Sequence, residues 1–208
     1  EFTGYEEHSS KGKMIKYIQD GEHCEVVLDR TPFYAESGGQ IGDMGYLKDE
    51  GFSFRVEDVQ ESEDEFIHFG VVESGNIQNV QSVEAEINDK RRKQIRRNHT
   101  ATHLLHQALK AVLGEHVQQA GSLVTPESLR FDLTHYEQIS DDHIEEIELC
   151  VNAVIMENKT VETEVKNYKA ARDEGAVSLF GEKYGNEVRV VSVPGFSKEL
   201  CGGTHVNR

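Results

Sequence analysis

Apolar and polar positions in residues 23–87 alternate with the short period of β-strands. Runs rich in Val, Ile, Phe and Tyr are separated by glycine-bearing turns, as in CEVVLDR, FSFRVEDV, FIHFGVV and VQSVEAEI. Short strands of this kind in succession predict a small β-barrel or β-sandwich.

From Asn88 or Asp89, either of which can cap a helix, apolar residues recur at helical spacing as far as Leu113. Gly114 then ends the helix. One face of this helix collects the residues expected in the core, namely Ile95, Thr102, Leu105, Leu109 and Val112.

A second helix is expected from Ser140 to Asn158. Ser140 is its N-cap. Asp141 and Asp142 lie in the first turn, where their negative charges interact favourably with the positive end of the helix dipole. The face expected to point inward carries Ile144, Ile147, Val151 and Val154.

The other segments after residue 90 predict strands and one short helix. LRFDLTH, KTVETEV and EVRVVSV alternate like strands, residues 168–172 are helical, and LFGEKYG is rich in turn residues. We therefore predict two domains, a β module over residues 1–88 and an α+β domain over residues 89–208.

Between the first two strands, the segment TPFYAESGGQIGDMG carries four glycines, Gly38, Gly39, Gly42 and Gly45. Glycine permits positive φ and close backbone approach, so this loop either touches a ligand or simply connects two strands. It matches neither GxGxxG nor GxxxxGK[ST], and the chain carries no ATP-binding signature.

Charge is distributed unevenly. The net charge of -16 opposes long-range attraction to nucleic-acid phosphates, but six positive charges are concentrated in residues 90–97. This run is either a local nucleic-acid footprint or a solvated helix face. It consists of Lys90, Arg91, Arg92, Lys93, Arg96 and Arg97.

Composition indicates a soluble globular protein, with 37% apolar and 29% charged residues. No stretch approaches the roughly 20 apolar residues of a membrane span, which argues against a membrane protein. Cys24, Cys150 and Cys201 are odd in number and widely spaced, which favours a reducing compartment, the cytoplasm. The chain starts at Glu1 without a secretory signal, so we expect a segment excised from a longer protein.

Two pairs of residues have the spacing of metal ligands. His99 and His103 lie four apart and project from one helix face, although a lone HxxxH is also common in hydrogen-bonded histidine pairs. Cys201 and His205 repeat this interval in CGGTH. Together they provide one sulfur and three nitrogens, a set suited to tetrahedral Zn²⁺. The intervening residues, which let the backbone fold tightly, are Gly202 and Gly203.

The role of such a zinc ion is open at this stage. Four protein ligands are typical of a structural site, whereas a catalytic site keeps a position for water. We favour a metal that shapes the pocket while a water held by polar groups attacks, because HTATH lacks the general-base Glu of HExxH. His106 lies one turn beyond His103. It could replace one of the four ligands, contact a ligand without binding the metal, or lie on the surface.

The motifs HTATHLLHQAL, VQQAGSLV, LRFD, LFGEKYG, VRVV and CGGTH, in this order, resemble the editing region of alanyl-tRNA synthetases. TPFYAESGGQIGD resembles the segment that opens this region, so the similarity covers residues 33–205. It implies an α+β fold, with a small N-terminal β-barrel followed by an α/β zinc-binding editing domain. This domain also occurs in threonyl-tRNA synthetases, and free-standing editing proteins share the metal motifs.

The resemblance also implies an activity, namely hydrolysis of seryl- and glycyl-tRNA(Ala). His99, His103, Cys201 and His205 would bind one Zn²⁺. The residues implied to line the pocket for the wrong amino acid are Thr102 and Gln119; Thr102 is otherwise a core residue of its helix. The acceptor end of tRNA(Ala) would be the partner, with the basic run of residues 90–97 near its backbone. The parent enzyme would attach alanine to tRNA(Ala) using ATP.

Further residues and alternatives complete the prediction. Arg130 and Asp132 share one face of a strand and are either site residues or only an ion pair. One alternative function is a tRNA-binding module with purely structural zinc. The other is a free-standing deacylase that acts in trans.

Overall fold

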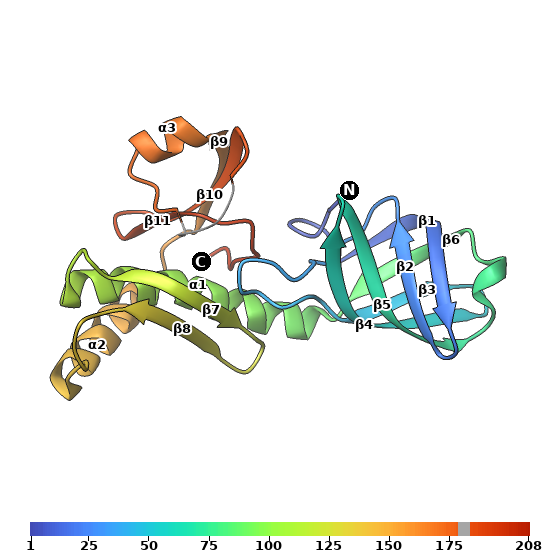
Figure 1. Cartoon of the computed structure of the whole chain (residues 1–208), viewed down its shortest axis with the longest axis horizontal. Helices are drawn as coiled ribbons and strands as arrows, with labels where there is room; N and C mark the ends of the chain where they lie inside the picture. The colour runs from blue at the N-terminus through green and yellow to red at the C-terminus, as the bar shows by residue number, and fades with distance from the viewer. Residues whose placement is uncertain (179–183) are drawn as a thin grey trace. The chain divides into compact units, whose positions relative to one another are not determined.

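The structure, a computed structural model, describes residues 1–178 and 184–208. The chain forms two compact units, Glu1–Gln94 and Ile95–Arg208. It combines a closed six-stranded β-barrel with smaller sheets and helices, as the α+β prediction requires (Figure 1). Among the helices described, none has the length and apolar character needed to cross a membrane. Most of the turn-rich segment LFGEKYG lies outside the described residues.

The first unit contains the barrel, in which the strand order is β1-β2-β5-β4-β3-β6. All neighbouring strands pair antiparallel, and closure removes the unpaired edges of an open sheet. The strands are β1 (Ser9–Asp20), β2 (His23–Leu28), β3 (Gly45–Asp49), β4 (Phe52–Ser62), β5 (Glu65–Ser74) and β6 (Ser82–Ile87), with a 3₁₀ helix, η1 (Ile77–Asn79), before β6.

The four predicted runs form β2, β4, β5 and β6, so the β-barrel prediction is confirmed. The sequence pattern did not identify β1 or β3. In β1 the buried positions are Ser10 and Gly12 rather than apolar residues, so this strand lacks the apolar alternation of a half-buried strand. Inside the barrel, the side chains with the least exposure include Val26, Phe33, Leu47, Phe54 and Val59.

The glycine-rich loop before β3 uses glycine in the two ways expected. Gly38 and Gly39 have positive φ angles of 57° and 83°. Gly45 instead lies against β6, where a Cβ atom would come 2.1 Å from the carbonyl oxygen of Glu86. These positions therefore need glycine for backbone reasons.

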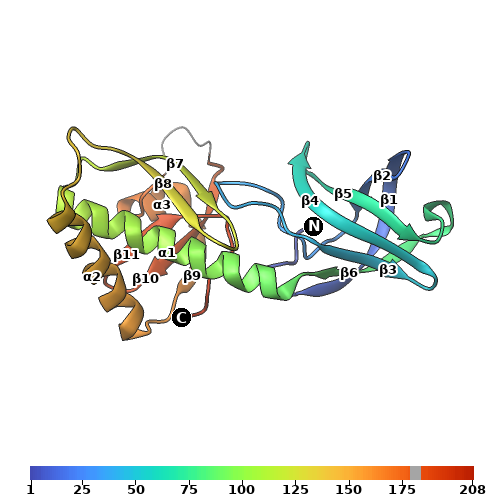
Figure 2. The ribbon, with the colours of Figure 1, turned by 90° about the horizontal axis from the view of Figure 1, so that it is seen from below.

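The second unit is built around helix α1 (Asp89–Leu113), whose first residues belong to the barrel unit. The β7–β8 hairpin and α2 lie on one side of α1, and the β9–β10–β11 sheet with α3 lies on the other (Figures 1 and 2). These elements are β7 (Gln118–Val124), β8 (Leu129–Thr134), α2 (Asp141–Glu157), β9 (Glu162–Asn167), α3 (Tyr168–Asp173), β10 (Glu187–Val193) and β11 (Ser197–Leu200).

Both long helices begin and end near the predicted residues. The Asn88 side chain accepts a hydrogen bond from the Arg91 backbone N–H at 3.0 Å, and Gly114 follows α1 with a φ of 113°. Ser140 caps α2, which ends at the left-handed residue Asn158.

One predicted core position is wrong. Ile147 and Val154 are buried, but the side of α2 that carries Ile144 faces solvent, and this residue is 44% exposed. The helix packs along a narrower stripe than its apolar sequence indicates, because only one side of it meets α1 and the hairpin.

Candidate metal centre

The four proposed ligands converge from two segments. His99 and His103 lie one turn apart on α1, and Cys201 and His205 lie in the CGGTH segment directly after β11. Their ligand atoms all lie within 4.8 Å of one another. The three histidines are buried, and Cys201 is half-buried.

The geometry fits a tetrahedral zinc ion. Cys201 Sγ lies 3.4 Å from His99 Nε2 and 3.3 Å from His205 Nε2. Zinc bonds of about 2.3 Å to sulfur and about 2.0 to 2.1 Å to nitrogen would place the two ligand atoms about 3.5 Å apart. These two pairs already have the separation that zinc requires, and the residues present could therefore hold the ion.

Protonation of Cys201 and His205 suits a metal, whereas zinc would have to displace a proton from His103. Burial raises the pKa of the Cys201 thiol, but the charges of His99, His205 and His103 outweigh burial and lower this pKa well below its ordinary value. Burial, together with the charge of His99, lowers the pKa of His205 well below its ordinary value. A thiolate and a neutral imidazole are the forms that bind zinc. For His103, burial lowers the pKa, but Glu199 and Cys201 outweigh it and raise the pKa to about 9.

Hydrogen bonds hold the CGGTH segment in place. Arg189 of β10 donates from Nη1 to the carbonyl oxygens of Cys201 and Gly203, at 3.0 and 2.8 Å. Thr100 Oγ1 lies 3.1 Å from His205 Nδ1. Sequence reasoning identified neither Arg189 nor Thr100, because the role of each depends on a tertiary contact that its position in the sequence does not reveal.

The two glycines of CGGTH have different surroundings. The Gly203 N–H donates to Cys201 Sγ at 3.3 Å, which turns the backbone toward the thiolate. A Cβ atom on Gly202 would meet open space, and neither residue has a positive φ. The tight turn thus depends on this N–H···S contact rather than on a conformation reserved for glycine.

His106 does not belong to the four-residue cluster. Its Nδ1 atom lies 3.1 Å from Oε1 of Glu199, a buried residue of β11. Sequence reasoning did not single out Glu199. The available signal is the alternation in SKEL, which places Glu199 on the same strand face as the buried Ser197.

The two predicted pocket residues lie in different settings. Thr102 is buried on α1 and donates from Oγ1 to the Asn98 carbonyl oxygen at 2.8 Å. Gln119 on β7 donates from Nε2 to Ser122 Oγ at 3.1 Å, and it lines a cavity of about 520 Å³ together with His106. Gln119 is therefore available to a ligand in this cavity.

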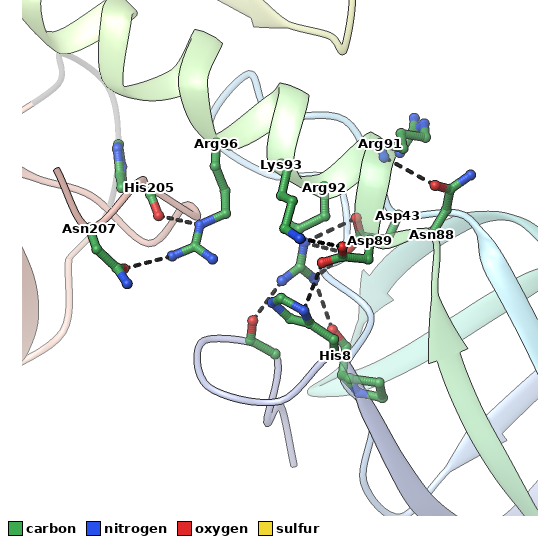
Figure 3. Close-up of polar contacts among 12 residues, drawn as sticks. His8, Asp43, Asn88, Asp89, Arg91, Arg92, Lys93, Arg96, His205 and Asn207 are labelled. Atoms are coloured by element: carbon green, nitrogen blue, oxygen red, sulfur yellow. Dashed lines mark hydrogen bonds and ion pairs between the residues drawn. The ribbon is translucent and has the colours of Figure 1, made fainter. Parts of the chain in front are cut away.

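The basic run of residues 90–97 is divided between interior and surface. Figure 3 shows the polar contacts of Arg91, Arg92, Lys93 and Arg96. Arg92 is 1% exposed, and its guanidinium contacts the Asp43 carboxylate and the carbonyl oxygens of Gly4 and Pro32. Such an arginine supports the barrel unit and is not available to a phosphate.

The neighbouring cations have other partners. Arg91 donates to the Gly42 carbonyl oxygen at 2.7 Å. Arg96 donates to the His205 carbonyl oxygen and, at 3.0 Å, to Asn207 Oδ1 (Figure 3). The exposed members of the run are Lys90, Lys93 and Arg97.

Arg130 and Asp132 form an ion pair on β8. Arg130 Nη2 lies 3.1 Å from Asp132 Oδ2, and the side chains are 65% and 46% exposed. Such a surface pair contributes little to stability, and neither residue belongs to the four-residue cluster.

Comparison with known proteins agrees with this architecture. Residues 1–91 match the family described as tRNA synthetases class II (A). Residues 188–208, which include Cys201 and His205, match the threonyl and alanyl tRNA synthetase second additional domain.

The similar curated proteins are alanine–tRNA ligases of which this chain covers only a part. An alanine–tRNA ligase of Legionella pneumophila (strain Lens) is 49% identical over 100% of this chain and 25% of its own length. Those of Bacillus subtilis and Thermoanaerobacter sp. are 49% and 47% identical over 99% of this chain and 24% of their own lengths. The chain thus spans about a quarter of the length of the relatives it matches. The resemblance drawn from the motifs is confirmed, and the chain belongs to the alanyl-tRNA synthetase family.

Proposed function

We propose that this chain hydrolyses the ester that joins a wrong amino acid, serine or glycine, to the 3′ end of tRNA(Ala). The observation that carries the proposal is the convergence of His99, His103, Cys201 and His205 within 4.8 Å. Two of these residues lie in the segment that matches the second additional domain. In this proposal, residues 89–208 form the editing domain and residues 1–88 form a barrel module.

Such a site is needed because binding alone discriminates poorly between alanine and similar amino acids. A pocket for alanine cannot strongly reject glycine, because one missing methylene changes binding by only about 1 to 3 kcal/mol. Serine adds a hydroxyl group. A second site that hydrogen-bonds this hydroxyl can favour serine over alanine by a factor of about 10⁴ to 10⁵, because its buried polar groups otherwise lose their partner.

Residues of this chain can provide that recognition. The Thr102 hydroxyl hydrogen is directed to Asn98, so its oxygen can still accept a hydrogen bond from a serine hydroxyl. The Gln119 amide can orient the amino acid or the attacking water from the cavity wall. Positioning of water against an already labile ester supplies much of the catalysis.

Zinc bound by the cluster would supply a fixed positive charge and a rigid frame for the pocket, since four protein ligands leave no open position for water. The side chains of Thr102 and Gln119 would orient the substrate beside it. The exposed cations Lys90, Lys93 and Arg97 are our proposed contacts to the tRNA backbone.

The parent protein would attach alanine to tRNA(Ala), as the names of the relatives indicate for those proteins, and we propose that it uses ATP to do so. We propose that it acts in the cytoplasm, where three cysteines outside any disulfide stay reduced. The whole-chain match to ligases about four times as long favours a segment of a synthetase over a free-standing deacylase.

The test compares hydrolysis of seryl-, glycyl- and alanyl-tRNA(Ala) by the purified chain and by Cys201→Ala. We expect the unmodified chain to hydrolyse the seryl and glycyl esters and to spare the alanyl ester. Cys201→Ala should lose zinc, because a ligand is removed, and its rate of ester hydrolysis should fall by a factor of at least about 100. Cys150→Ala, which removes a thiol of α2 away from the cluster, is the matched control and should keep both properties.

One outcome would contradict the proposal. Circular dichroism shows whether each variant keeps its fold. A zinc-bound, folded chain that binds tRNA(Ala) without hydrolysing any ester would instead be a binding module with structural zinc. If Cys201→Ala does not fold, Gln119→Ala decides: it should retain zinc and lose the preference for the seryl ester.

A further inference from the structure

Glu199 is a buried carboxylate that lies between two histidines of α1. It belongs to β11, two residues before Cys201, and is 5% exposed. Its Oε1 atom lies 3.1 Å from His106 Nδ1, and its Oε2 atom lies 3.8 Å from His103 Nδ1. Each carboxylate oxygen therefore faces a different imidazole.

A carboxylate in such an interior is costly unless polar groups compensate it. His106 supplies one compensation, because its Nδ1–H can donate directly to Oε1. His106 itself is buried and packs at 5.2 Å, ring centre to ring centre, against Phe131. Packing therefore fixes His106, and His106 fixes the carboxylate.

The second oxygen lies beside Nδ1 of His103. An imidazole that directs Nδ1 at Glu199 leaves Nε2, on the opposite side of the ring, for a metal. Histidine ligands of metals commonly place their other nitrogen against a carboxylate or carbonyl, which fixes the ring and its tautomer. His205 has a comparable arrangement, with Thr100 Oγ1 at 3.1 Å from its Nδ1.

We propose that Glu199 is a positioning residue for the metal centre: it orients the His103 imidazole so that Nε2 enters the ligand cluster, and His106 holds the carboxylate in place. The inference rests on the zinc centre of the proposed function. Because Glu199 and Cys201 share one short segment, this contact also ties the Cys201 end of the cluster to α1.

The experiment measures zinc affinity of the purified chain by competition with a chromophoric chelator, and the absorption spectrum of the Co²⁺-substituted protein. Glu199→Gln keeps the shape of the side chain and removes its charge. We expect a 10- to 100-fold loss of zinc affinity, in the range typical of such supporting groups, and an altered Co²⁺ spectrum. Glu187→Gln, at an exposed position of β10, is the matched control and should change neither.

His106→Gln tests the second part and serves if Glu199→Gln does not fold. It leaves the carboxylate without its imidazole anchor, so zinc affinity should fall by a smaller factor. Unchanged affinity and an unchanged Co²⁺ spectrum in the folded variants would overturn the positioning role and leave the zinc centre intact. Failure of the unmodified chain to bind zinc would instead refute the proposed metal centre on which the inference rests.

Discussion

His68 shows how one buried side chain makes stability depend on pH. It lies inside the barrel, where Nδ1 is 2.9 Å from the Val26 carbonyl oxygen and Nε2 is 2.7 Å from Thr31 Oγ1. A carbonyl only accepts, so Nδ1 carries the proton and Nε2 accepts from the threonine hydroxyl. Both contacts fit a neutral ring. Burial lowers its pKa to about 4, although the hydrogen bond to Val26 opposes the shift.

The sign of the pH effect follows. Between pH 6.5 and 4 the unfolded chain binds a proton at His68 that the folded barrel does not. The contribution of the neutral His68 to the free energy of unfolding is fully present above pH 6.5. It is lost as the pH falls toward 4, and the total loss is about 3 kcal/mol. Urea unfolding followed by hydrogen exchange of barrel amides, from pH 6.5 to 5, should show this decline. In His68→Gln the decline should disappear over that interval, and an unchanged slope would contradict the assignment.

At the scale of elements, the beginning of α1 is fixed by a buried ion pair of the barrel unit. Arg92 Nε lies 3.1 and 3.0 Å from the two oxygens of Asp43, and the remaining guanidinium nitrogens reach the carbonyl oxygens of Gly4 and Pro32. Asp43 also accepts from the Tyr34 backbone N–H at 2.8 Å. The positive charge of Arg92 and the negative charge of Asp43 thus neutralise each other, so removal of either leaves a buried charge without its ionic partner.

We expect Arg92→Met to lower the free energy of unfolding of the barrel unit by about 3 to 5 kcal/mol, because it leaves a buried carboxylate without its partner. Lys93→Met is the matched control. Its ion pair with Asp89, at 2.6 Å, is exposed, and the loss should stay below about 1 kcal/mol (Figure 3). Equal effects in urea denaturation would show that Arg92 contributes no more to stability than an exposed cation does.

How much the sequence predicts also depends on the element. Helices α1 and α2 were predictable because caps and helical periodicity are local signals. Strand β7 was not, since QQAGSLV has little apolar alternation, and β11 has only the four residues of SKEL. The metal-ligand set was predictable from residue type and spacing. Glu199 and Arg92 were not, because their roles depend on which distant segments pack against them.

At the scale of the whole molecule, the metal proposal concerns one unit only. All four ligands lie in Ile95–Arg208, and the barrel unit contributes none of them. Zinc at 100 times its dissociation constant would stabilise the folded second unit by about 2.7 kcal/mol.

Removal of zinc with a chelator should therefore reduce hydrogen-exchange protection in the second unit and leave the barrel amides unchanged. The sheet of β9, β10 and β11 should respond most, because the CGGTH segment follows directly from it. Cys201→Ala, which lacks a ligand, should show no further change on chelation. A uniform loss of protection across both units would indicate that the two do not unfold separately.

The sequence separation within the cluster also bears on how the protein is made. His99 and Cys201 are 102 positions apart. At about 5 to 20 residues per second, a ribosome that has just added His99 needs roughly 5 to 20 s to reach Cys201. The complete barrel sequence and α1 are thus synthesised well before the second pair of ligands exists. A premature stop within that interval would release a chain with all six barrel strands and only half of the cluster.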